Sequence, residues 1–79
     1  MVKSSIHNNI RKLRFDAEEM TQQQLADEVG VSRQTIVAIE KGNYSPSLEL
    51  AFRIARLFQT TVEEVFTYVP GESRGKKEK

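Results

Sequence analysis

Several side chains able to contact DNA bases gather at helical spacing between residues 33 and 41. At about 100° per residue they share one face, which carries a guanidinium, an amide, two small apolar groups and an ammonium but no carboxylate. Arginine pairs with guanine, glutamine with adenine, and small apolar side chains contact the methyl group of thymine, all in the major groove of DNA. This composition predicts a base-reading surface, with ordinary solvated surface as the alternative. The residues of the face are Arg33, Gln34, Val37, Ala38 and Lys41.

The face needs a helix to carry it, and the flanking residues predict two short helices joined by a turn. Thr21 and Gln24 have the spacing of a capping box, which starts the first of these helices. Gly30 supplies the left-handed residue that ends it. Ser32 is an N-cap candidate for the second helix, and Gly42 ends that helix.

Residues at fixed spacing through this unit and beyond it match the pattern of a known family. They are Gln22, Leu25-Ala26, Val29-Gly30-Val31-Ser32, Gln34-Thr35-Ile36, Ile39-Glu40, Gly42 and Pro46-Ser47-Leu48. On these residues the chain resembles the helix-turn-helix of the phage-repressor and Cro-like transcriptional regulators, also called the XRE family. The resemblance covers about residues 6–66, with the motif itself at about residues 21–42. It implies an all-α, five-helix domain of the lambda-repressor type that binds double-stranded operator DNA as a homodimer, with the helix after Gly30 in the major groove.

The resemblance also implies roles for individual residues. Arg33 and Gln34, at the exposed start of the second helix of the motif, occupy positions where the family reads base edges. The positions at which the family grips the DNA backbone hold Gln22, Lys41, Asn43 and Tyr44. Asn43 and Tyr44 stand in a polar turn, so ordinary structural roles are an equal alternative for them.

Arg14 and Glu40 occupy positions where the family commonly has an ion pair between the first and third helices. Glu40 lies beside Ile36 and Ile39 on the inward arc of its helix, where an unpaired carboxylate would be costly. Arg11 is a competing partner, because the link after the first helix is one residue longer than is usual in the family. A structural role is therefore predicted for Glu40, not a catalytic one.

The overall charge favours a reader of specific sites over a general DNA coat. Twelve Lys and Arg against eleven Asp and Glu give a net charge of +1, and the basic excess lies in the tail from residue 70, so the rest of the chain is slightly acidic. DNA binding must then come from local placement, with Arg33, Lys41 and either Arg11 or Lys12 turned toward phosphates.

The chain of 79 residues is short enough for one domain, expected over residues 1–69, with a disordered basic tail over residues 70–79. The alternative role of the tail is a weak phosphate-binding arm. There is no Cys and hence no disulfide or Cys-based metal site, and neither a metal, a cofactor nor a catalytic constellation is expected. No stretch approaches the roughly 20 apolar residues of a membrane span, so a cytoplasmic protein is expected.

Three further helices are expected to complete the fold. The first runs over Ser5–Asp16, with Phe15 off its apolar stripe, where it either covers a partner surface or folds over the helix end. Another, over Leu48–Phe58, is apolar around more than half of its circumference. The last begins at a second capping box at Thr61 and is stopped by Pro70.

The apolar circumference of the helix over Leu48–Phe58 exceeds what one small core buries, and such an excess normally marks an interaction site. We therefore expect a homodimer built on this helix and the segment after it. The candidate contacts are Leu57, Phe58, Phe66 and Tyr68, with Phe15 as a further candidate.

Three classes of function follow from these observations. The leading one is a sequence-specific DNA-binding transcriptional regulator, a repressor that occupies a palindromic operator as a dimer. The second is a protein-interaction module, such as the antitoxin half of a toxin–antitoxin pair, which has a protein partner. The third, a small nuclease or other hydrolase, needs clustered carboxylates and a metal, whereas the acids here are scattered, so no enzyme is expected.

Overall fold

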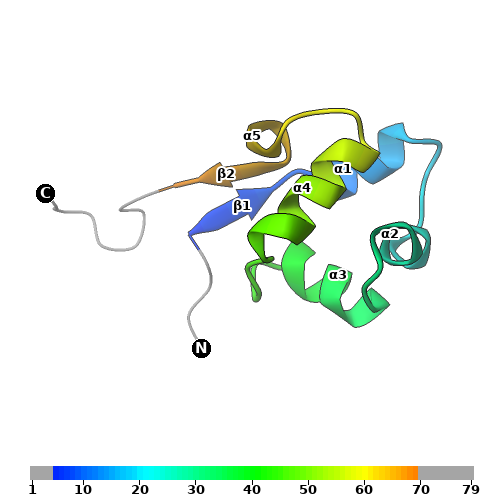
Figure 1. The fold of residues 1–79 in the computed structure, drawn as a ribbon, viewed down its shortest axis with the longest axis horizontal. Helices are drawn as coiled ribbons and strands as arrows, with labels where there is room; N and C mark the ends of the chain where they lie inside the picture. The colour runs from blue at the N-terminus through cyan, green and yellow to red at the C-terminus, as the bar shows by residue number, and fades with distance from the viewer. Residues whose placement is uncertain (1–4, 70–79) are drawn as a thin grey trace, which may run out of the picture.

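The computed structural model describes residues 5–69, which form five helices and one two-stranded ribbon (Figure 1). The expectations for the tail over residues 70–79 lie outside the described residues. In chain order the elements are β1 (Ile6–Asn8), α1 (Ile10–Asp16), α2 (Gln22–Val29), α3 (Arg33–Glu40), α4 (Leu48–Leu57), α5 (Val62–Val65) and β2 (Phe66–Tyr68).

The starts of four helices follow from side chains that accept a hydrogen bond from a backbone amide of the first turn. Thr21 and Gln24 form the complete capping box expected at α2, with bonds of 3.0 Å and 2.8 Å. At Thr61 the hydroxyl accepts from the amide of Glu64 at 3.2 Å. The hydroxyls of Ser32 and Ser47 cap α3 and α4 in the same way.

One hydrophobic core receives side chains from every helix. Its fully buried large members are Ile10, Leu25, Ile36, Ile54 and Val65. Helix α2 packs against both α3 and α4, so the two helices of the motif are held by the same core. The motif is therefore a rigid part of the domain and not an appended arm.

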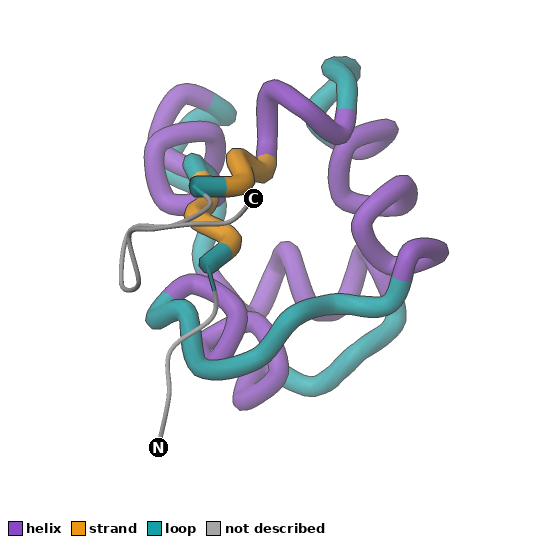
Figure 2. The backbone as a smooth tube through the Cα atoms, turned by 90° about the vertical axis from the view of Figure 1, so that its left-hand side faces the viewer, coloured by secondary structure: helices purple, strands orange, loops and turns teal. Residues whose placement is uncertain are grey.

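The ribbon corrects two expectations. The helix predicted from Ser5 begins only at Ile10, and the chain after Val65 is a strand and not a continued helix. Ile6–Asn8 pairs antiparallel with Phe66–Tyr68, so the two ends of the described chain lie side by side (Figure 2). The expected all-α domain thus carries a small two-stranded sheet.

The physical reason for the late start of α1 is the side chain of Asn8. Its Oδ1 accepts from the amide of Ile10 at 3.1 Å, a local bond that competes with helix continuation toward the N-terminus. The amide of Asn9 donates to the carbonyl of Val65 at 2.8 Å, which ties the start of α1 to the end of α5. The β-branched and aromatic residues of β2 suit a strand.

The link between α1 and α2 makes its turn without glycine. Glu18 and Glu19 both adopt left-handed backbone conformations, with φ of 61° and 60°. The amide of Met20 donates to the carbonyl of Arg14 at 2.9 Å and closes the end of α1. A conformation that glycine adopts freely is thus imposed on two glutamates.

Candidate nucleic-acid interface

Helix α3 divides into a buried side and an outer side. Ile36 and Ile39 are buried in the core, whereas Arg33, Gln34 and the C-cap residue Lys41 are exposed. Val37 and Ala38 are half-buried between these sides. The five residues predicted to form the base-reading face therefore all retain accessible surface on α3 and its C-cap. Their contact with bases stays a prediction.

The turn between α2 and α3 is set by Gly30, which has a φ of 81° and ends α2 in the left-handed conformation. Arg53 of α4 stabilises the turn, because its Nη1 donates a hydrogen bond to the carbonyl of Val29 at 3.1 Å. A Cβ atom at position 30 would stand 3.3 Å from Nη1 of Arg53, so both conformation and space favour glycine there.

A largely buried ion pair joins α3 to α1. Nε and Nη2 of Arg14 lie 2.8 Å and 3.2 Å from the two carboxylate oxygens of Glu40, with side chains only 14% and 10% exposed. Nη1 of Arg14 donates to the carbonyl of Met20 at 2.8 Å. The partner of Glu40 is thus Arg14, and the competing candidate Arg11 is exposed on α1.

Gln22 connects this ion pair to the start of α3. Its Nε2 donates to Oε1 of Glu40 at 3.2 Å, and its Oε1 accepts from Nη1 of Arg33 at 3.4 Å. A residue proposed to contact phosphate is therefore bonded to a residue proposed to read bases. No periodicity in the sequence points to this contact, because the partners of Gln22 lie on a different helix.

Asn8 is a second connection that the sequence did not reveal. Its Nδ2 donates to the carbonyl of Ile39 at 3.1 Å, so strand β1 holds the C-terminal end of α3. Its Oδ1 accepts from the amide of Ile10, the first residue of α1. One asparagine therefore fixes the relative positions of the ribbon, α1 and α3.

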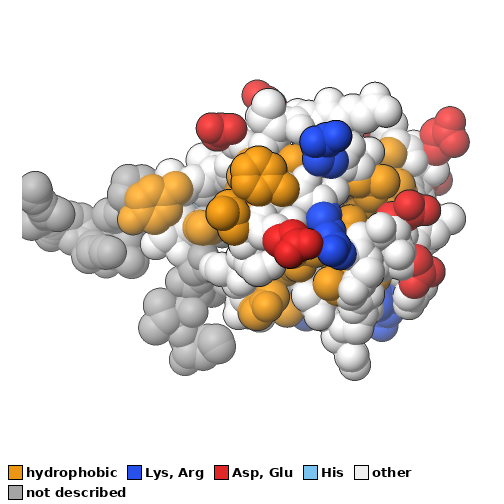
Figure 3. Space-filling view, viewed as in Figure 1, with side chains coloured by type: hydrophobic (Ala, Val, Ile, Leu, Met, Phe, Trp, Pro, Cys, Tyr) orange, Lys and Arg blue, Asp and Glu red, His pale blue; other side chains and the backbone are white. Residues whose placement is uncertain are grey.

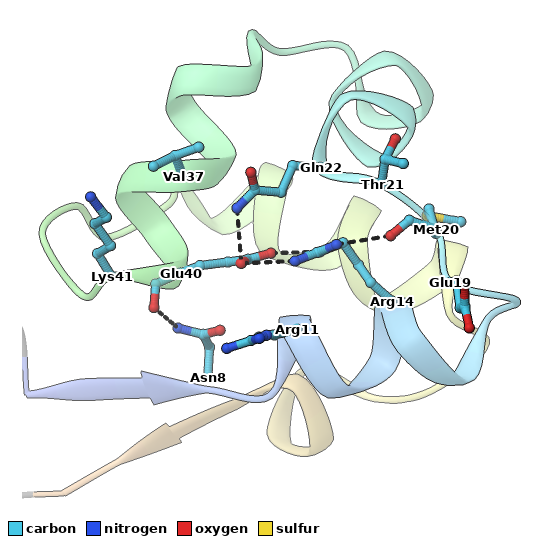
Figure 4. Close-up of a pocket in the computed structure, with 10 residues that line it drawn as sticks. All are labelled: Asn8, Arg11, Arg14, Glu19, Met20, Thr21, Gln22, Val37, Glu40 and Lys41. Atoms are coloured by element: carbon cyan, nitrogen blue, oxygen red, sulfur yellow. Dashed lines mark hydrogen bonds and ion pairs between the residues drawn. The ribbon is translucent and has the colours of Figure 1, made fainter.

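An open recess of about 640 Å³ lies between α1, the start of α2 and the end of α3 (Figure 4). Its floor includes the Arg14–Glu40 pair, whereas Arg11 and Lys41 enter the lining from α1 and from the end of α3. The residues that line it are Asn8, Arg11, Arg14, Glu19, Met20, Thr21, Gln22, Val37, Glu40 and Lys41.

The remaining phosphate candidates lie in the loop after α3. Gly42 takes a φ of 81°, and the amide of Asn43 donates to the carbonyl of Ala38 at 3.0 Å, which closes the helix. The side chains of Asn43 and Tyr44 are exposed. Both residues are thus accessible to a ligand, and the backbone of Asn43 also has a structural role.

The candidates for a dimer interface divide into two groups. Leu57, Phe58 and Phe66 pack partly buried against the core of the described domain. Tyr68 is 63% exposed, and Phe15 is also exposed. Two residues of α4 that the sequence analysis did not single out, Leu48 and Phe52, are 73% and 53% exposed. Figure 3 shows apolar surface over α4 and the ribbon among charged side chains.

Over residues 5–69 no group of three or more His, Cys, Asp or Glu side chains is placed to hold a metal ion. None of the helices described there has the length and apolar character needed to cross a membrane.

Comparison with known proteins points to the same motif. A helix-turn-helix family model, HTH_3, matches residues 10–65. The chain is 57% identical, over 67% of its length and 80% of the other chain, to an uncharacterized HTH-type transcriptional regulator of Methanocaldococcus jannaschii. An HTH-type transcriptional regulator of Bacillus subtilis is 52% identical over 58% of this chain and 70% of the other. The cryptic phage CTXphi transcriptional repressor of Vibrio cholerae is 33% identical over 73% of this chain and 51% of the other.

Proposed function

The chain belongs to the helix-turn-helix (XRE) family of DNA-binding transcriptional regulators, and on that premise we propose that it represses transcription by occupying a palindromic operator as a homodimer. The family is one of DNA-binding regulators and not of enzymes. A regulator of transcription works where the DNA is, so the proposed location is the cytoplasm.

The observation that carries this proposal is the outer side of α3. It presents Arg33, Gln34 and Lys41 without a carboxylate, on a helix whose opposite side is locked into the core by Ile36 and Ile39. Base recognition needs such rigidity, because a reading side chain must meet its base edge within a fraction of an ångström. We assign base contacts to Arg33, Gln34, Val37 and Ala38.

We assign contacts with the DNA backbone to the residues that flank α3. Gln22 stands at the first turn of α2, and Lys41, Asn43 and Tyr44 follow the last turn of α3. Their polar groups would fix the register of the protein on the duplex without reading its sequence.

Repression by a dimer is supported by two observations. One relative at 33% identity is itself a phage transcriptional repressor. The exposed apolar residues Leu48, Phe52 and Tyr68 offer surface that a second copy would cover. A two-fold dimer would place two copies of α3 about 34 Å apart, which is one turn of DNA.

Selection of bound DNA from a random pool tests this function. The expected product is one palindromic motif with half-sites about 10 base pairs apart, centre to centre. Sedimentation should show a dimer, at least on the selected DNA. A chain that enriches no sequence, or that remains a monomer both free and on DNA, would contradict the proposal.

The second candidate function is a protein-interaction module, such as the antitoxin half of a toxin–antitoxin pair. The specific observation in its favour is the same exposed pair on α4, Leu48 and Phe52, which lie one helical turn apart. In that case substitution of Phe52 by Glu would abolish capture of the protein partner and leave DNA enrichment unchanged.

A further inference from the structure

We propose that the recess between α1, α2 and α3 holds one phosphate of the DNA backbone, clamped between Arg11 and Lys41 and bonded by Gln22. The inference rests on the proposed function and adds to it a contact from α1. It assigns a ligand-binding role to Arg11, which the geometry separates from its neighbour Lys12.

The two cations of the clamp form no ion pair with any of residues 5–69. Arg11 and Lys41 are exposed at opposite sides of the recess (Figure 4). Lys12 instead lies 3.1 Å from Asp16 and does not line the recess. An ammonium that already faces a carboxylate gains less from a phosphate than a free cation gains.

Gln22 has one hydrogen left for a ligand. Its amide nitrogen must face Glu40, because a flipped amide would bring Oε1 to 3.2 Å from a carboxylate oxygen. Its oxygen is then turned to Arg33. The amide nitrogen carries two hydrogens, and Glu40 takes one of them, so the second is free to donate to a phosphate in the recess.

The acids of the recess do not cancel its attraction for an anion. Glu40 is neutralised by Arg14 and accepts three hydrogen bonds, two from Arg14 and one from Gln22. Glu19, at the exposed α1–α2 turn, is the other carboxylate of the lining. The lining as a whole has three cations, Arg11, Arg14 and Lys41, against these two carboxylates, which leaves one positive charge in excess.

The position of the recess suits a backbone phosphate next to a base-reading helix. Val37 and Lys41 belong both to its lining and to the outer side of α3. A DNA strand whose bases meet α3 therefore passes the mouth of the recess. Each strand of the duplex carries one phosphate per about 3.4 Å of helix axis, so one of them comes within reach of the long side chains of Arg11 and Lys41.

The first experiment compares Arg11→Ala, Lys41→Ala and the neighbouring control Lys12→Ala on the DNA selected by the wild-type chain. Binding is measured over a salt series from about 50 to 200 mM. The slope of log K against log salt should fall by about 0.9 per protomer for Arg11→Ala and for Lys41→Ala, because each loses one cation that displaces a counterion. The Lys12→Ala variant should keep the wild-type slope, and all three should keep the wild-type base preference.

The second experiment locates the phosphate. Single phosphates of the selected site are replaced in turn by neutral methylphosphonates. The wild-type chain should lose several-fold affinity at one phosphate in each half-site, and at this position Arg11→Ala and Lys41→Ala should lose nothing further. Arg11→Gln replaces Arg11→Ala if the alanine variant melts below the wild type.

Three results would overturn the clamp. The first is a salt slope for Arg11→Ala equal to that of the wild type, and the second is a fall in slope for Lys12→Ala as large as that for Arg11→Ala. The third is that Arg11→Ala and Lys41→Ala become insensitive to methylphosphonate replacement at two different phosphates. A wild-type chain that selects no DNA would overturn the proposed function together with the clamp. Failure of the clamp alone gives a different result: the wild-type chain still selects and binds DNA, and only the Arg11 and Lys41 variants depart from the expected slopes.

Discussion

Replacing Glu40 with alanine leaves the largely buried guanidinium of Arg14 without its counter-charge. The pair is bidentate and its side chains are 14% and 10% exposed, so water screens the remaining cation poorly. Loss of one partner from a fully buried pair costs about 3–5 kcal/mol, and the residual exposure places Glu40→Ala at about 3 kcal/mol. Gln22 also loses the acceptor that orients its amide.

Urea denaturation followed by circular dichroism measures the loss in free energy of unfolding. Thermal denaturation measures it independently: for a domain of this size 1 kcal/mol corresponds to about 4–8 °C in Tm, so the melting temperature should fall by about 12–24 °C. Glu49→Ala is the matched control, because Glu49 lies 2.9 Å from Arg53 in an exposed pair on α4. Its cost should not exceed about 1 kcal/mol.

The outcome that would refute this reasoning is a Glu40→Ala protein that melts like the parent but no longer binds DNA. Glu40 would then act on the ligand directly or through Gln22, and the pair would not be a framework element. Equal losses for Glu40→Ala and Glu49→Ala would show instead that burial of the first pair does not decide its contribution.

Three further substitutions test the fold that positions α3. Asn8→Ala should destabilise the domain by about 1–3 kcal/mol in urea, because the carbonyl of Ile39 and the amide of Ile10 lose their side-chain partner; an unchanged midpoint would show that water replaces it. Glu19→Gly should stabilise it by about 0.5–1 kcal/mol, since glycine accepts the φ of 60° without strain, and a lower Tm would contradict this. Gly30→Ala should cost about 1–2 kcal/mol at a φ of 81°, and a neutral result would mean that the turn relaxes.

Local chemistry made the helix-turn-helix predictable from the sequence. The starts of α2 and α3 follow from hydroxyl caps at Thr21 and Ser32, and the end of α2 from Gly30. Each of these signals acts within a few residues and needs no knowledge of the fold. The inward placement of Ile36 and Ile39 follows from helical spacing in the same way.

The ribbon and the links around Gln22 were not predictable on that basis. Strands β1 and β2 are three residues each and come from opposite ends of the described chain, so neither shows an alternating pattern long enough to distinguish it from a helix turn. Apart from the local bond between Asn8 and Ile10, the side-chain bonds of Gln22 and Asn8 join residues 11 to 32 positions apart. Such contacts depend on how helices pack, which the local sequence does not specify.

The central claim, that α3 reads the operator, is tested most directly by the base preference of Gln34→Ala. Binding of the variant and of the wild type is measured on every single-base variant of the selected operator, with Gln23→Ala as control, because Gln23 lies on α2 and bonds Asp27 at 2.9 Å. We expect Gln34→Ala to lose about 1–3 kcal/mol of discrimination at one base pair in each half-site, while its affinity for random DNA is unchanged. The base affected should be an adenine, because the glutamine amide pairs with N6 and N7 of adenine. A Gln34→Ala protein that keeps the full base preference of the wild type would contradict the central claim, because α3 would then not be the reading helix.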